Sequence, residues 1–341
     1  EDVSNAALQA VDLPHDFLIE NENDLYETTD AWYLRALDVP ESWCASCVLV
    51  RFDGVYMDCD VLLNGHVVCT HHYGYTAFDV DLTSRLLVGR NTLAVHIRHQ
   101  SPNSRWYSGA GIYRDVTLHV LPKRHIPLDG VYVTTTHELE SWTMTIDTEL
   151  CGVKDNGVLT HVLLDGDVPV CDVTVEAAGD HANAVMQVLS PKLWSPDAPN
   201  VYTLQTMLGN QVIRQNVGFR DLTFTTDRGL LVNGAPVKLH GVCLHHDLGC
   251  LGSAFHEKAM RRQLCAMRQM GVNALRTSHN PPAKQVMDLC DELGIFVVDE
   301  AFDMWLRAKT PFDYARFCPT DMPADVAAWV RRERNHPALL M

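Results

Sequence analysis

The sequence predicts a multidomain β and α/β protein: a jelly-roll-like β-sandwich, then an immunoglobulin-like β-sandwich, then the first half of a (β/α)8 barrel. Three observations lead to this fold class. Short apolar runs separated by turns occupy residues 30–121, and further short runs with a different spacing occupy residues 126–222. From residue 225 onward, strand-like runs alternate with helix-like ones. We therefore expect domains at 1–124, 125–222 and 223–341, which suits a chain of 341 residues.

The first region consists of expected strands with no helix between them. These strands lie at 31–34, 47–52, 60–63, 67–69, 91–97 and 115–121. Asn64 and Gly65 separate two of the runs, and an Asn-Gly pair between apolar runs is a strong signal for a tight β-hairpin. Many short strands without helices favour two sheets packed face to face.

The second region also contains strands, but they are spaced differently. They are expected at 131–133, 142–147, 157–164, 170–175 and 201–208. Pro191, Pro196 and Pro199 interrupt the chain between the last two runs. Short strands with this punctuation are typical of an immunoglobulin-like sandwich.

The third region changes its hydrophobic period. Apolar residues recur at helical spacing within 260–267 and within 286–293, where they fall at i, i+3, i+4 and i+7. The full expected order is a strand at 237–240, a helix, a strand at 273–276, a helix, a strand at 295–298, a helix at 325–334 and a strand starting at 338–341. This alternation predicts a parallel sheet covered by helices, with about three and a half of the eight βα units of a closed barrel.

Composition excludes some classes of partner. The chain has 27 Lys and Arg against 43 Asp and Glu, a net charge of −16. This balance argues against binding to nucleic acid or to an anionic membrane surface, while a neutral ligand such as a sugar is compatible with it. The chain opens with EDVSNAALQA, which lacks a signal-peptide run, and no stretch approaches the roughly 18 apolar residues of a membrane span.

The 11 cysteines are scattered and odd in number. Several, such as Cys59 and Cys243, lie inside apolar strand-like runs, so we expect reduced, buried thiols and a cytoplasmic protein. Cys44 and Cys47 have a C-x-x-C spacing, but no second pair and no His pair follows at zinc spacing. An ordinary strand is favoured there over a metal or redox site.

Polar side chains follow three of the expected barrel strands, and in such barrels function lies at these strand ends. His245 follows the first strand and suits hydrogen bonding to sugar hydroxyls, although solvated loop histidines are the alternative. Arg276 ends the second strand and opens the run Arg-Thr-Ser-His-Asn-Pro-Pro. It could hold a carboxylate through two hydrogen bonds and keep it ionised, or form a structural pair with a glutamate.

The third strand end is the most acidic. Asp299, Glu300 and Asp303 precede Trp305 within seven residues. Carboxylates accept hydrogen bonds from sugar hydroxyls, and an indole face packs on the C–H side of a sugar ring. Two of these acids could also be the catalytic pair of a glycosidase. The residues alone therefore indicate a carbohydrate site at the end of an incomplete barrel.

Two runs carry a family resemblance. Residues 273–281, Asn-Ala-Leu-Arg-Thr-Ser-His-Asn-Pro, and residues 291–300, Asp-Glu-Leu-Gly-Ile-Phe-Val-Val-Asp-Glu, resemble the first signature of the family 2 glycoside hydrolases. That family contains β-galactosidases, β-glucuronidases and β-mannosidases. Residues 11–16, 31–35, 54–58, 106–115 and 218–220 resemble other parts of its sugar-binding and immunoglobulin-like domains.

The resemblance implies retaining hydrolysis of β-glycosidic bonds. Residues 333–341 resemble the opening of the family's second signature, whose general acid/base Glu follows shortly. We therefore expect the acid/base and nucleophile glutamates to lie beyond Met341, which leaves this chain as a frame that is inactive alone. By position, His245 and His279 match sugar-contacting histidines, and Arg276 matches the Arg that orients the nucleophile.

Three other positions depart from the common form of the family or belong to one branch of it. Asn280 stands where the commonest form of the signature has a Tyr, and we expect it to be one of the sugar-binding residues. Asp303 falls where some β-galactosidases place a magnesium-ligating Glu, and Trp305 falls where they place a His ligand. Because Trp cannot bind the ion, we expect no metal and no cofactor, with magnesium in the complete enzyme doubtful.

The resemblance favours β-galactoside hydrolysis and a homo-oligomer in the complete enzyme. One alternative is a β-glucuronidase of the same family, whose cationic groups for the substrate carboxylate lie outside this chain. Another is a non-catalytic carbohydrate-binding protein formed by the two sandwiches. The open half-barrel is also expected to expose apolar strand edges.

Overall fold

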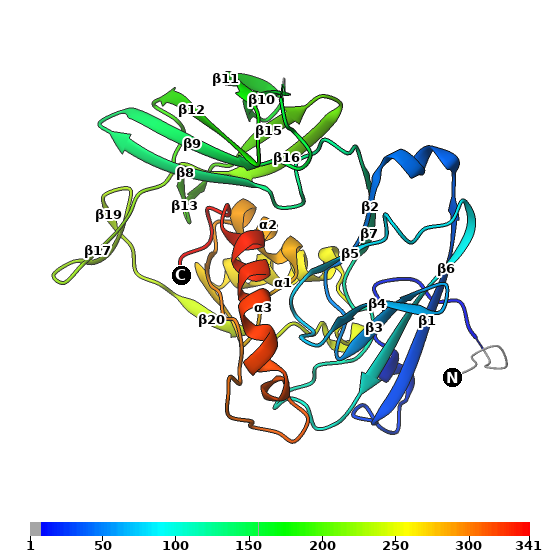
Figure 1. Ribbon diagram of the computed structural model, residues 1–341. Coiled ribbons are helices and arrows are strands. Elements are labelled where there is room, and N and C mark those ends of the chain that lie inside the picture. Colours follow the sequence, from blue (N-terminus) through cyan, green and yellow to red (C-terminus); the bar gives the residue numbers. More distant parts are fainter. Residues whose placement is uncertain (1–7, 156) are drawn as a thin grey trace.

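The computed structural model describes residues 8–155 and 157–341, which form three parts (Figure 1). The first part, in blue and cyan, is a β-sandwich, and the second, in green, is another β-sandwich. The third part, in yellow to red, is a parallel sheet with helices beside both sandwiches. This is the fold class that the strand and helix patterns predict.

The first sandwich consists of two antiparallel sheets, with strand orders β1-β6-β3-β4 and β5-β2-β7. Its elements are η2 (Phe17–Glu20), β1 (Thr29–Val39), η3 (Glu41–Ala45), β2 (Cys47–Phe52), β3 (Cys59–Leu63), β4 (His66–His71), β5 (Phe78–Asp81), β6 (Gly89–His99) and β7 (Val116–Leu121). Alternate side chains point between the sheets, as in β2, where Val48, Val50 and Phe52 are buried. The short strand β5 had not been expected.

The predicted hairpin at Asn64 and Gly65 joins β3 to β4. Both residues have positive φ angles, 51° and 83°, as a type I′ turn requires. The Asn64 side chain also contacts β6, because its Nδ2 donates to Asn91 Oδ1 at 2.9 Å and its Oδ1 accepts from Thr92 N at 2.9 Å. The turn residues therefore fix both the hairpin and the neighbouring strand.

The second sandwich has the sheets β11-β10-β15-β16 and β12-β9-β8. Its strands are β8 (Val131–Glu138), β9 (Ser141–Glu149), β10 (Gly157–Asp165), β11 (Val168–Ala177), β12 (His181–Leu189), β13 (Trp194–Ser195), β14 (Ala198–Pro199), β15 (Tyr202–Leu208) and β16 (Gln211–Val217). The sequence interpretation missed β12 and β16 as well as the two-residue strands β13 and β14. The inward face of β12 is Ala182, Ala184, Met186 and Val188, and alanine carries a weak strand signal.

The third part begins with the antiparallel strands β17 (Leu222–Thr225), β18 (Gly229–Val232) and β19 (Ala235–Pro236). The parallel strands β20 (Gly241–Leu244), β21 (Ala274–Thr277) and β22 (Phe296–Val298) follow, with η4 (Gly249–Leu251), α1 (Glu257–Gln269), α2 (Lys284–Leu293), η5 (Tyr314–Arg316) and α3 (Cys318–Glu333). Leu339 forms a parallel bridge to Val297, where a fourth strand was expected to start.

Two expected elements of the barrel are shifted. Residues 237–240 were expected as a strand, but the first parallel strand is β20 and 237–240 lie outside it. There the Asn273 side chain replaces a strand partner: it accepts from His240 N at 2.7 Å and donates to Lys238 O at 2.9 Å. The helix expected at 325–334 is α3, which begins seven positions earlier despite Pro323 inside it.

Surface features agree only partly with expectation. Cys59 is buried as expected, but Cys243 is exposed, because it lies on the edge strand β20 of an open sheet. Cys47 begins the ordinary strand β2.

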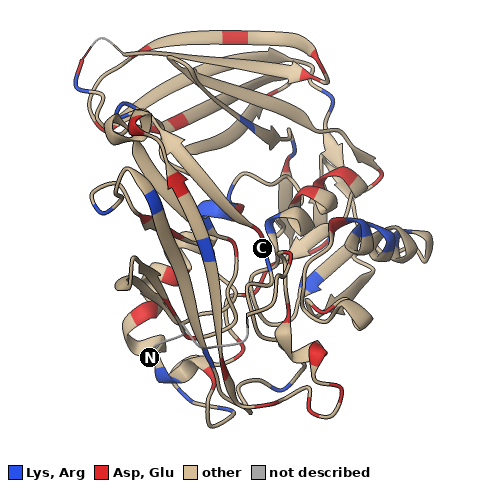
Figure 2. Cartoon of the chain, turned by 90° about the vertical axis from the view of Figure 1, so that its right-hand side faces the viewer, with Lys and Arg blue, Asp and Glu red and all other residues tan. Residues whose placement is uncertain are grey.

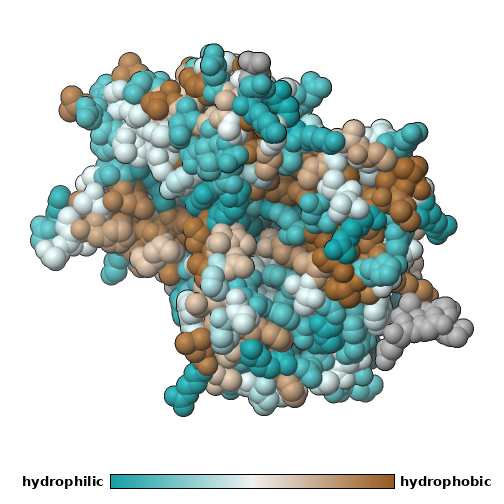
Figure 3. Space-filling view, in the orientation of Figure 1, coloured by the Kyte–Doolittle hydropathy of each residue, from teal (hydrophilic) through white to brown (hydrophobic). Residues whose placement is uncertain are grey.

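Figure 2 shows Asp and Glu on all three parts with Lys and Arg between them. In Figure 3 apolar atoms gather at the left, where the β17–β19 hairpin lies in Figure 1 and Phe224 is 62% exposed. Among the described residues, no helix is both long and apolar enough for a membrane crossing.

The second sandwich is attached to the barrel part by a buried tryptophan. Trp194 is fully buried, its Nε1 donates to Asp291 O at 2.8 Å, and its ring packs edge-on against Phe296 at 5.1 Å. At the same junction Gly294 ends α2 in the left-handed conformation, against Pro196. The second sandwich therefore packs directly against the barrel part at β22.

Candidate active site

The three predicted strand ends meet at one edge of the parallel sheet. His245 directly follows β20, and its Nδ1 donates to the Ser278 carbonyl at 2.6 Å, in the loop after β21. In the same way, Thr277 Oγ1 accepts from Glu300 N at 3.0 Å, in the loop after β22. Because parallel strands end on the same side, residues far apart in sequence lie together here.

Arg276, His279 and Glu300 form a charged cluster at this edge. Arg276 Nε donates to Glu300 Oε1 at 2.7 Å, and His279 Nδ1 lies 2.8 Å from Glu300 Oε2. The structural Arg–Glu pair weighed as an alternative is therefore present. Even so, the Arg276 side chain remains 41% exposed, so part of its guanidinium can still reach another anion.

Asp303 is enclosed by cations rather than open to a ligand. Arg105 Nε donates to its Oδ2 at 3.0 Å, Arg105 Nη2 binds its Oδ1, and Lys309 Nζ donates to Oδ1 at 2.7 Å. Its side chain is only 3% exposed. Burial acts to raise the pKa of Asp303, but the hydrogen bonds from Arg105 and Lys309 outweigh it and hold that pKa below its ordinary value.

Trp106, from the first sandwich, forms a wall of the site. Its ring is stacked on His245 with centroids 4.9 Å apart, and it meets His279 edge-on at 5.5 Å. Its Nε1 donates to the Tyr75 hydroxyl at 3.2 Å, which fixes the ring. The sequence did not identify Trp106 or Arg105 as site residues. The only signal was the run 106–115, which resembles part of the family's sugar-binding domain.

Asn280 and Trp305 are placed differently from the other candidates. Asn280 is 3% exposed, and its Oδ1 accepts from His279 N at 3.2 Å, so its side chain supports the backbone of the loop. Trp305 is 49% exposed and packs edge-on against Phe302 at 5.0 Å. It does not line the cavity that His279 and Asp303 share. Their predicted contact with sugar stays a prediction.

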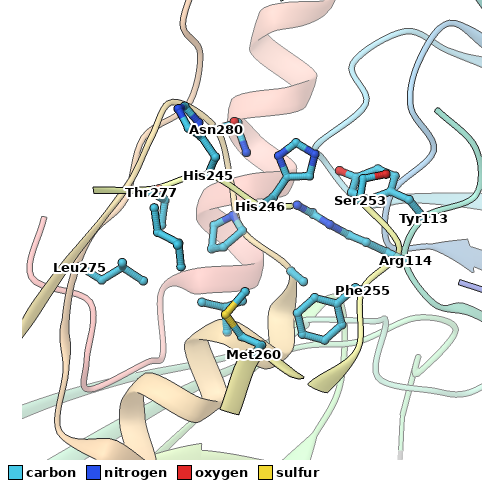
Figure 4. A pocket seen from close by; sticks show the side chains of 14 residues that line it. Tyr113, Arg114, His245, His246, Ser253, Phe255, Met260, Leu275, Thr277 and Asn280 are labelled. Atoms are coloured by element: carbon cyan, nitrogen blue, oxygen red, sulfur yellow. The ribbon is translucent and has the colours of Figure 1, made fainter. Parts of the chain in front are cut away.

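A small cavity lies beneath His245 and Asn280, lined also by Arg114 and His246 (Figure 4). Its volume is about 30 Å³, which accommodates a water molecule but not a sugar. Arg114 is buried and donates to Tyr75 O and Pro281 O, both at 2.9 Å. These bonds connect the first sandwich to the loop after β21, so the cavity is part of the frame of the site.

His246 completes this frame. Its Nε2 lies 3.0 Å from the Ser108 carbonyl and donates to it. Burial lowers the pKa of His246 to about 4, so the ring is neutral near pH 7. This hydrogen bond from His246 to Ser108 holds the end of the loop that carries Trp106.

The acidic strand end does not supply a catalytic pair in this structure. Asp299 is buried, with Oδ1 accepting from Thr277 Oγ1 at 2.9 Å and Oδ2 from Trp329 Nε1 at 2.5 Å. Asp303 is buried by Arg105 and Lys309, as described above. Neither carboxylate is exposed to a substrate, which argues against the pair considered from the sequence.

The sequence of this chain matches three known domain families. Residues 9–122 match the sugar binding domain of glycosyl hydrolases family 2, and residues 125–220 match the domain described as glycosyl hydrolases family 2. Residues 224–341 match the TIM barrel domain of the same family. The chain belongs to glycosyl hydrolases family 2.

Individual relatives support this membership. A β-galactosidase from Bacteroides ovatus is 36% identical over 98% of this chain and 42% of its own length. The crystal structure of a β-glycosidase from Bacteroides vulgatus matches with a TM-score of 0.91 and 32% identity, over 97% of this chain and 45% of that one. A Bacteroides uniformis β-glucuronidase, covalently bound to cyclophellitol-6-carboxylate aziridine, matches with a TM-score of 0.84 and 28% identity, over 97% and 42%. The chain thus spans less than half the length of these family 2 relatives.

Asp303 and Trp305, the two positions that the sequence resemblance compared with magnesium ligands of some β-galactosidases, do not fit that ion. Magnesium requires carboxylate oxygens with free lone pairs in a site of negative charge. Here Arg105 and Lys309 occupy the Asp303 oxygens, and the second position is the indole of Trp305. Among the described residues, Asp288, Asp291 and His336 also lie close together, but His336 Nδ1 is hydrogen-bonded to Asp291 at 2.6 Å.

Proposed function

We propose that the complete enzyme containing this chain hydrolyses terminal β-galactosidic bonds with retention of configuration. In this proposal residues 1–341 hold the sugar, and the two reacting carboxylates come from a further part of a longer polypeptide. The observation that carries it is the cluster of Arg276, His279, His245 and Trp106 at the carboxyl ends of parallel strands. Family 2 membership supports β-glycoside hydrolysis as the class of reaction.

The mechanism assigns distinct tasks to these groups. A retaining glycosidase uses two carboxyl groups roughly 5–5.5 Å apart, one as nucleophile and the other as acid and then base. Arg276 keeps the nucleophile ionised by hydrogen bonding to it, since a nearby guanidinium lowers a carboxyl pKa. His245 and His279 bind sugar hydroxyls, and the Trp106 ring excludes water from one side of the sugar.

The choice of galactoside over glucuronide rests on charge. A glucuronide carries a carboxylate, which needs a free cation in the site. The proposal assigns Arg276 to the nucleophile, and Asp303 already pairs with the two other cations, Arg105 and Lys309. The Bacteroides ovatus relative, named a β-galactosidase, also supports a neutral sugar. The alternative, a β-glucuronidase, is favoured by the likeness to the Bacteroides uniformis enzyme.

The protein's setting is part of the same proposal. We infer a cytoplasmic, homo-oligomeric enzyme that needs no cofactor. Exposed thiols at Cys44, Cys243 and Cys250 support a reducing compartment, where such groups persist.

The test of the site is the Arg276→Ala substitution in the complete enzyme, assayed on an aryl β-galactoside. Loss of the group that holds the nucleophile ionised should lower kcat at least about 100-fold. Arg261→Ala is the matched control, because Arg261 pairs with Glu257 and Glu292 on the outer surface of α1 and α2. Equal rates for the two variants would remove the proposed role of Arg276.

A further inference from the structure

A groove on the first sandwich lies directly beside the candidate site. It has a volume of about 360 Å³ and runs between the segment 18–26 and the loop 99–109. Sites for small ligands are concave and have volumes of about 300–1,000 Å³. The groove lies near the lower end of this range, which suits a ligand of about one sugar unit. It shares Asn103, Ser104 and Trp106 with the cavity that His279 and Asp303 line.

The groove presents aromatic rings that the fold holds in place. Tyr26 is 56% exposed and packs edge-on against Tyr107, with centroids 6.0 Å apart. Its backbone is fixed by a turn in which Tyr26 N donates to Asp24 Oδ1 at 2.9 Å. Tyr107 is oriented through its hydroxyl, which donates to Asp16 Oδ2 at 2.8 Å. An exposed ring in a fixed orientation is suited to packing against the C–H face of a sugar.

Arg105 adds a polar group to the same wall. Two of its nitrogens bind Asp303, and its side chain is 50% exposed. Its Nη1 has no hydrogen-bond partner within residues 8–155 and 157–341, although a guanidinium has five N–H donors. The pair with Asp303 therefore orients a planar donor whose remaining N–H groups can bind hydroxyls.

We propose that this groove binds the leaving-group sugar of the substrate. Trp106 is the shared wall: its ring stacks on His245 in the candidate site and also lines the groove. The inference rests on the proposed function, because an enzyme that removes a terminal sugar has its neighbouring sugar unit on the leaving side. Tyr26 and Arg105 then determine which glycosides are good substrates, without touching the reacting atoms.

The test compares two substrates in the complete enzyme. Tyr26→Ala should lower kcat/KM for lactose about 10-fold, the size expected for one lost aromatic contact, and leave kcat/KM for β-galactosyl fluoride, whose leaving group is too small to reach the groove, within about 2-fold. Phe224→Ala is the matched control, since Phe224 is 62% exposed on the distant strand β17. It should leave both values unchanged.

Binding measured by calorimetry separates this inference from the proposed function. A lactose analogue with sulfur in place of the glycosidic oxygen, which the enzyme does not cleave, should bind the wild-type protein about 10-fold more tightly than it binds Tyr26→Ala. If the enzyme does not hydrolyse the aryl β-galactoside, the proposed function fails, while the groove still stands on a Tyr26-dependent affinity. Equal affinity of the two proteins for this analogue, or an equal fall in kcat/KM for both substrates, would overturn the proposed role of the groove.

Discussion

Asp16 is the residue whose replacement should disturb the site most from a distance. Its carboxylate is 1% exposed and accepts five hydrogen bonds. Oδ1 accepts from Leu18 N at 3.1 Å and Ala110 N at 3.0 Å. Oδ2 accepts from the Tyr107 hydroxyl at 2.8 Å, from Ser253 N at 2.8 Å and from Ser253 Oγ at 3.0 Å. One side chain therefore joins the N-terminal segment, the Trp106 loop and the loop before α1.

The structure sets the cost of two replacements. In Asp16→Asn the amide oxygen can still accept from Leu18 N and Ala110 N, while the amide nitrogen faces Ser253 and Tyr107. Both hydroxyls can rotate to accept, but Ser253 N cannot, so one buried donor is left unpaired, at about 1–3 kcal/mol. Asp16→Ala leaves three backbone N–H groups without an acceptor, and should cost upwards of about 3 kcal/mol.

Urea unfolding monitored by tryptophan fluorescence measures these costs. Asp12→Asn is the control, because Asp12 is exposed in the same segment. The unfolding midpoint should fall from Asp12→Asn to Asp16→Asn to Asp16→Ala. In the complete enzyme, kcat/KM on an aryl β-galactoside should fall in the same order, since the loop that carries Trp106 loosens. Equal midpoints for Asp16→Asn and Asp12→Asn would refute the reasoning.

Three further changes have defined outcomes. Gly294→Ala should cost about 2 kcal/mol more than Gly271→Ala in urea unfolding: both glycines have positive φ after a helix, but only at Gly294 would a Cβ lie under 3.0 Å from the Pro196 carbonyl. Burial raises the pKa of Asp299 from 3.8 to about 7, so the folded state binds this proton more tightly and loses stability as pH rises from about 4 to 7. Relative to wild type, Asp299→Asn should gain about 4 kcal/mol of unfolding free energy across that range, and parallel pH curves would contradict it. Removing magnesium with a chelator should leave aryl β-galactosidase activity within about 2-fold, because Asp303 is engaged by Arg105 and Lys309; a loss that added magnesium restores would show that the ion binds.

Local patterns predicted much of the fold because they report local physics. The strand at 47–52 and the Asn64-Gly65 hairpin appear where their alternation and turn residues place them. The helix α3 begins seven residues before the predicted helix at 325–334 and includes Pro323, whose missing N–H removes one helical hydrogen bond without ending the helix. Tertiary packing decides such cases, and a single sequence does not reveal it.

The candidate site likewise contains some contacts that local sequence patterns predict and others that only the fold brings together. Arg276 and His279 lie three residues apart, so a strand end followed by a tight loop was enough to place them together. Arg105 and Asp303 are 198 residues apart and belong to different domains, and no spacing rule connects them. The enclosure of Asp303 by two cations, and the Trp106 ring over His245, therefore needed the three-dimensional structure.

The most direct test of the proposed function compares kcat/KM of the complete enzyme on an aryl β-galactoside and on the matching aryl β-glucuronide. We expect the galactoside to be preferred by at least about 100-fold, since the proposal assigns Arg276 to the nucleophile and Asp303 already pairs with the charges of Arg105 and Lys309, so a substrate carboxylate would gain little from these cations. A preference for the glucuronide would contradict the account, because the complete site would then have to hold a cation that is free to bind the substrate carboxylate.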